Sequence, residues 1–78
     1  MKVYEVKKGE TDIERGRVMM AIEGTESKVQ SIVELMKNEG YYSTQCAEYG
    51  DKDGELIEYF MISRADKSDF VKTYKNFK

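Results

Sequence analysis

Residues 17–40 read RVMMAIEGTESKVQSIVELMKNEG, and this stretch decides the fold. Its second half carries apolar side chains at the i, i+3, i+4 and i+7 spacing that forms one stripe along a helix. These positions are Val29, Ile32, Val33 and Met36. Thr25 suits the N-cap of such a helix, and Gly40 suits the position just beyond its end. The pattern therefore predicts a helix over 25–39.

The first half of the same stretch, residues 17–23, predicts a β-strand. One face of this strand would carry Val18, Met20 and Ile22. Methionine and alanine also favour helices, and residues 11–14 (TDIE) have the pattern of a capping box that would begin one. A strand is favoured over this alternative because the segment is short and bounded by glycines on both sides.

The rest of the chain predicts three more strands and a second helix. Residues 2–7 are rich in β-formers and predict a first strand. Residues 41–49 and 56–63 predict two strands, which the glycine- and aspartate-rich residues 50–54 join as a hairpin turn. Residues 66–77 have apolar side chains at helical spacing and predict a closing helix.

The strand at 56–63 is apolar on both of its faces. Leu56, Phe60 and Ile62 share one face, and the opposite face carries Ile57, Tyr59 and Met61. Such a strand is expected to be central in its sheet or to be covered on its second side. The sequence leaves open whether the second face of the sheet is covered.

Together these segments predict an α+β fold with the order ββαββα. We expect a single small domain over residues 1–78, with a four-stranded antiparallel sheet and helices packed on one face. A chain of this length supports one modest hydrophobic core.

The composition argues against most kinds of catalysis. The chain has 78 residues, a formal net charge of −2, no histidine and one cysteine. Histidine is the commonest general base and metal ligand, so Ser-His-Asp and Cys-His catalysis and zinc sites of cysteine and histidine are excluded within one chain. We therefore expect no enzyme activity, no cofactor and no metal site. Carboxylates holding a divalent cation are the residual route to catalysis.

The sequence also gives an expectation about the compartment. The longest apolar run, residues 18–22, is far shorter than the ~20 residues of a membrane-spanning helix, so no membrane partner is expected. The first residues do not form the apolar core of a signal peptide. A lone cysteine, Cys46, suits a reducing compartment, and we expect it to be a buried structural thiol. These features favour a cytoplasmic protein.

The favoured function is a small intracellular protein-binding module that acts by surface contact, not by catalysis. The partner would bind at an exposed edge of the sheet or at the second hairpin, which concentrates aromatic and acidic side chains that suit a protein interface. The predicted partner-binding residues are Tyr41, Tyr49, Asp51, Asp53 and Glu55. Small acidic domains of this kind serve as accessory or inhibitory proteins of mobile elements, which is an analogy at the level of the fold only.

Two alternatives stay open. A nucleic-acid-binding accessory protein would use a basic C-terminal helix, with contacts to phosphate from Arg64, Lys67, Lys72 and Lys75. A homo-oligomeric structural component, such as a homodimer, would pair the exposed edges of the sheet.

Overall fold

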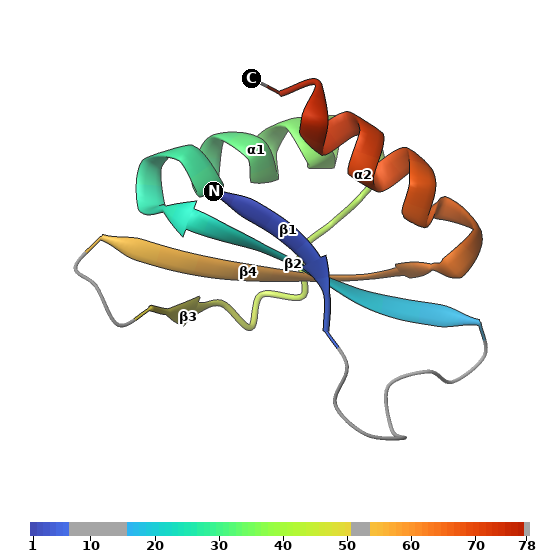
Figure 1. Cartoon of the computed structure of the whole chain (residues 1–78), viewed down its shortest axis with the longest axis horizontal. Helices are drawn as coiled ribbons and strands as arrows, with labels where there is room; N and C mark the ends of the chain where they lie inside the picture. Colours follow the sequence, from blue (N-terminus) through green and yellow to red (C-terminus); the bar gives the residue numbers. More distant parts are fainter. Residues whose placement is uncertain (7–15, 51–53, 78) are drawn as a thin grey trace.

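The computed structural model describes residues 1–6, 16–50 and 54–77. Four strands form one antiparallel sheet in the order β1-β2-β4-β3, and two helices lie together on one side of it (Figure 1). The elements are β1 (Lys2–Glu5), β2 (Arg17–Thr25), α1 (Glu26–Asn38), β3 (Glu48–Tyr49), β4 (Glu55–Ser63), a short 3-10 helix η2 (Arg64–Asp66) and α2 (Lys67–Lys75). Their order is ββαββα, which confirms the predicted fold class.

The two long strands β2 and β4 form the centre of the sheet. Nine antiparallel pairs join them, from Arg17 opposite Ser63 to Thr25 opposite Glu55. The segment at 17–23 is therefore a strand, as predicted, and it continues through Thr25 into α1. β4 has β2 on one side and β3 on the other, which confirms that it is a central strand.

The hydrophobic core lies between the helices and the face of the sheet that they cover, here called the covered face. The rings of Phe60 on β4 and Phe70 on α2 meet edge to face with their centroids 5.1 Å apart, which ties the last helix to the sheet. The other buried apolar residues packed in this core are Val18, Met20, Ile22, Val29, Ile32, Met36, Leu56, Ile62 and Tyr74. Burial of these side chains is the main favourable term in folding.

Backbone hydrogen bonds define both ends of α1. Thr25 occupies the N-cap position as predicted, but its side chain makes no capping bond, and the N–H of Glu26 donates to the carbonyl of Gly54 at 2.6 Å. At the other end Gly40 has a φ of +93°, and the N–H of Tyr41 donates to the carbonyl of Met36 at 2.8 Å. This is the bond of a Schellman motif, in which glycine is favoured because it adopts the left-handed conformation without strain.

The strand predicted over 41–49 is wrong for most of its length, because only Glu48–Tyr49 forms β3. Ser43 makes an isolated bridge to Phe60, while Glu48 pairs with Ile57. Four residues separate Ser43 from Glu48, but only two separate Ile57 from Phe60, so two residues bulge out of the ladder. Gln45 lies in this bulge with a φ of 67°.

The remaining predicted elements agree with the structure at their centres and differ at their ends. The first strand ends at Glu5, two residues before its predicted end at Lys7. Lys7 and the capping-box pattern at 11–14 lie outside the described residues. α2 covers 67–75 of the predicted 66–77, because η2 precedes it. β3 and β4 are antiparallel neighbours, so they form the predicted hairpin.

Candidate functional site

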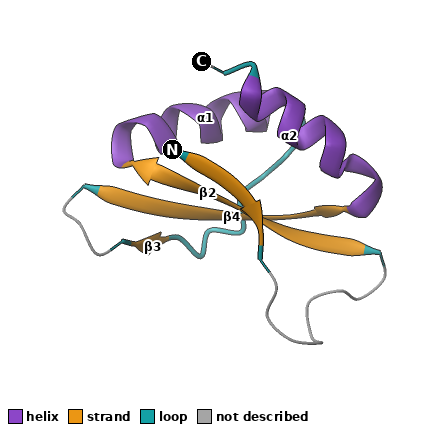
Figure 2. Cartoon of the chain, viewed as in Figure 1, coloured by secondary structure: helices purple, strands orange, loops and turns teal. Residues whose placement is uncertain are grey.

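The side of the sheet opposite the helices carries a second set of apolar side chains. We call this side the open face and define it by six residues of the three strands β1, β2 and β4. They are Tyr4, Met19, Ala21, Ile57, Tyr59 and Met61. Figure 2 shows both helices on the other side of the sheet, and no helix of the described residues packs on the open face.

The centre of the open face is held together by two tyrosines. Tyr4 and Tyr59 are the cross-strand partners of Ala21 from opposite sides, and between them they bury it completely, with 0% exposure. Tyr4 is itself 36% exposed, and Met19, Ile57 and Met61 are only half-buried. The open face therefore presents aromatic and thioether groups to its surroundings.

A carboxylate anchors each of these tyrosines. The Tyr59 hydroxyl donates to Glu48 Oε1 at 2.6 Å, and the Tyr4 hydroxyl donates to Glu23 Oε1 at 3.1 Å. The bond to Glu48 and partial burial raise the pKa of Tyr59 to about 12. Burial, with the bond to Glu23, also raises the pKa of Tyr4. Both phenols stay protonated at neutral pH, so they act as oriented donors and rigid contact surfaces.

A shallow hollow opens beside Tyr59. Its volume is about 250 Å³, and it is lined by Met19, Thr44, Cys46, Glu48 and Tyr59. The bulged segment before β3 forms one wall, because the N–H of Thr44 donates to the carbonyl of Tyr59 at 2.8 Å. Cys46 is exposed on this wall, so the prediction of a buried thiol is wrong. The bulge that ended the predicted strand is the reason, because it turns this part of the chain outward.

The residues predicted to bind a partner do not lie on one surface. Tyr41 is half-buried and packs its ring edge to face against Phe70, with centroids 5.4 Å apart. Tyr49 is 73% exposed and is paired with Leu56, so it lies on the covered side of the sheet, whereas Glu55 lies on the open side. Asp51 and Asp53 lie outside the described residues.

The basic residues of the nucleic-acid alternative are also in different environments. Lys67 Nζ lies 2.8 Å from Glu5 Oε1 and ties α2 to β1. Lys72 and Lys75 are exposed on α2, and Arg64 is exposed in η2, at the end of β4. One of the four predicted cations is therefore engaged in a structural ion pair.

One carboxylate points into the fold. Glu58 is paired with Ile22, so it lies on the covered face among apolar side chains. Its Oε1 is buried and has no hydrogen-bond partner among the described residues. Burial raises the pKa of Glu58, and a hydrogen bond from Ser43 opposes this shift. An ionised carboxylate in this position costs stability.

The described residues contain no group of three or more cysteine, aspartate or glutamate side chains arranged to hold a metal ion. Within the same residues, no helix is long and apolar enough to cross a membrane. A comparison with protein-family models, curated proteins and solved structures finds no match to this chain.

Sequence reasoning did not select the open face as a binding surface. The signal was present, because 56–63 is apolar on both faces, and Ile57, Tyr59 and Met61 were expected to lie opposite the core residues. The sequence predicted that the helices pack on one face, but it left open whether the second face is covered. Neither helix lies on that second face (Figure 2).

Proposed function

We propose that this chain is a small protein-binding module whose open face contacts its partner. The observation that supports this is a sheet with apolar residues on both faces and helices on one. A strand serving a single core needs apolar residues on alternate positions only, so the second set has another use. Tyr4 is exposed and its neighbours Met19, Ile57, Tyr59 and Met61 are half-buried, so this face presents a partly exposed apolar surface, a feature of interaction sites.

The residue types of the open face suit a protein partner. Tyrosine and methionine are enriched in protein interfaces, because tyrosine offers a large rigid ring and methionine adapts its shape. Tyr4 and Tyr59 are already oriented by carboxylates, so little side-chain entropy is lost when a partner binds. Glu23 and Glu48 beside them disfavour the phosphates of a nucleic acid.

The proposed module works by contact, not by catalysis, and we place it in the cytoplasm because a lone exposed thiol suits a reducing compartment. An accessory or inhibitory role fits a protein whose activity is to cover part of another protein. The two tyrosines and two methionines of the open face would provide the central contacts, since central aromatic side chains dominate binding energy in interfaces.

A capture experiment tests the proposal. The immobilised chain is exposed to a nuclease-treated lysate of its native cells, beside the variants Met61→Lys and Gln30→Lys. Met61 lies on the open face, and Gln30 is exposed on α1, so both variants add the same charge at different surfaces. We expect captured proteins to be lost with M61K and retained with Q30K. Equal capture by both variants would contradict the role of the open face.

A further inference from the structure

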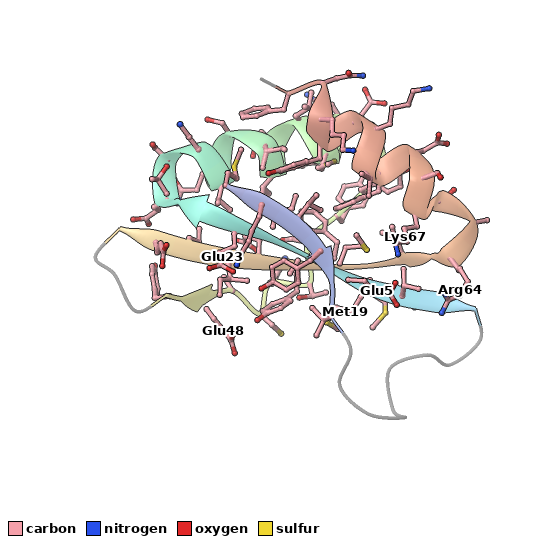
Figure 3. All side chains as sticks on the ribbon, viewed as in Figure 1. Glu5, Met19, Glu23, Glu48, Arg64 and Lys67 are labelled. Atoms are coloured by element: carbon pink, nitrogen blue, oxygen red, sulfur yellow. The ribbon has the colours of Figure 1, made fainter. Side chains whose placement is uncertain are left out.

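The two ends of the open face carry opposite charges. At one end Arg17 begins β2 and is exposed on the open face, and the exposed Arg64 of η2 lies just beyond the end of the neighbouring β4, beside α2. At the other end lie three carboxylates, on β2, β3 and β4, with Lys2 beside them. They are Glu23, Glu48 and Glu55. Figure 3 shows Glu23 and Glu48 toward one end of the sheet and Arg64 toward the other, with Met19 between them.

This arrangement is complementary to itself. Two copies of one sheet face can be stacked by a two-fold axis that lies in the plane between them. If the axis runs along the strands, like ends meet, and the carboxylates of the two copies face each other. If the axis runs across the strands, opposite ends meet, and each arginine end faces a carboxylate end. Charge therefore selects the second arrangement.

We infer that the open face is covered by a second copy of this chain, with the strands of the two sheets running in opposite directions. The inference rests on the proposed function, because it names the occupant of the same surface. Stacked sheets are separated by ~10 Å, a distance that the interdigitated tyrosine and methionine side chains of two open faces fill.

The pairing of β2 with β4 also fixes the register of the dimer. Ala21 opposite Tyr59 is the middle of the nine pairs, so the two-fold axis passes close to it. Met61 of one copy then lies against Ile57 of the other, and the reverse contact repeats on the far side of the axis. Arg17 of one copy lies near Glu55 of the other, also twice.

The dimer should dissociate reversibly on dilution. The open face is at most roughly 30 Å long, because its longest strands have nine residues at ~3.3 Å each. It is at most roughly 19 Å wide, because it has four strands at ~4.8 Å spacing, and its edge strands are short. That area is at the small end of specific interfaces, which bury about 800 Å² on each partner. Its measurement therefore needs chain concentrations from about 5 to about 500 μM, the range in which weak dimers form.

Charge reversal at the two ends provides a sharp test. Sedimentation velocity is run on the wild type, on R17E, on E55K and on an equimolar mixture of the two variants. In R17E the reversed residue faces Glu55 of its own second copy, and in E55K the new cation faces Arg17. Each variant alone is expected to dimerise about tenfold more weakly, because attraction becomes repulsion at two sites. The mixed dimer restores both attractive pairs, so the dimer content of the mixture should rise well above that of either variant alone.

Several outcomes would overturn the inference. A wild-type chain that stays monomeric over the whole concentration range would contradict it. So would a dimer that neither charge variant weakens, or a mixture of the two variants with no more dimer than either variant alone. The variant M61K, with Q30K as control, provides a second readout at the centre of the interface, and thermal melts confirm that each variant is folded. If the chain is monomeric but its capture of lysate proteins is lost in M61K, the second copy is ruled out as the occupant and the proposed function stands. If the chain is monomeric and M61K captures as well as the wild type, the proposed function is contradicted as well.

Discussion

The covered and open faces of the sheet are formed by the same two strands, but their side chains have different surroundings. On the covered face Met20 and Phe60 are at most 1% exposed, because α1 and α2 close over them. On the open face their sequence neighbours Met19 and Met61 are half-buried, and neither α1 nor α2 lies over them. The comparison shows that apolar character on a strand has two uses here. One face stabilises the fold, and the other is available for contact.

The largest expected effect is on the covered face. Phe60→Ala removes a fully buried ring that packs against Phe70, and we expect it to lower the free energy of unfolding by about 3–5 kcal/mol. A loss of that size is a large fraction of the stability of a domain this small. Urea denaturation measures it. A loss below about 1 kcal/mol would show that the core is not centred on Phe60.

The neighbouring residue on the open face should behave differently. Met61→Ala removes a half-buried side chain, so we expect the unfolding free energy of the monomer to fall by only about 1 kcal/mol. The same variant should weaken contact with the partner, whereas F60A changes only the covered face. Denaturation at low concentration and sedimentation at high concentration separate the two effects. A loss as large as that of F60A would mean that the open face belongs to the core.

Glu58→Gln tests the partly buried carboxylate on the covered face. Because the pKa of Glu58 is raised in the folded state, the wild type gains stability from this group as the pH falls and loses it as the pH rises through that raised pKa. The glutamine variant cannot ionise, so we expect it to be the more stable of the two at neutral pH. The difference should disappear in acid, where Glu58 is protonated in both states. Thermal melts over this pH range decide, and a variant less stable than the wild type at neutral pH would contradict the assignment.

Tyr59→Phe should have only a small effect on stability. It removes the hydroxyl that donates to Glu48 but keeps the ring on the open face, so the cost is about 0.5–1 kcal/mol for a partly exposed bond. Ultraviolet titration provides a sharper readout. The wild type should contain a tyrosine that ionises only near pH 12, and this high-pH step should be lost in the variant. An unchanged titration curve would show that another tyrosine carries the raised pKa.

The sequence predicted the elements whose pattern is local and repeated. The stripe on α1 and the alternation in β2 and β4 depend on short-range spacing, and Gly40 ends α1 by its own conformational freedom. The segment at 41–47 was missed because its path depends on distant contacts. Tyr41 packs on Phe70, almost thirty residues away in the chain, and Gln45 adopts a positive φ that its neighbours in sequence do not indicate.

The candidate surface was predictable only in part. The residues that face away from the core were identified correctly, because alternation on a strand is strict. The placement of both helices on one face was predicted, but whether anything covers the second face depends on contacts between distant elements, and these have no local pattern. The predicted hairpin surface was divided for the same reason, since Tyr49 and Glu55 lie on opposite sides of the sheet.

The most direct test of the account uses the methionines of the two faces. Methyl NMR of the ¹³C-methionine-labelled chain is recorded over the dilution series that spans the monomer and the dimer. Met19 and Met61 lie on the open face, whereas Met20 and Met36 are buried in the core. If a second copy covers the open face, the methyl signals of Met19 and Met61 shift with concentration while those of Met20 and Met36 stay fixed. Signals that are constant for all four, or that move only for the core pair, would contradict it.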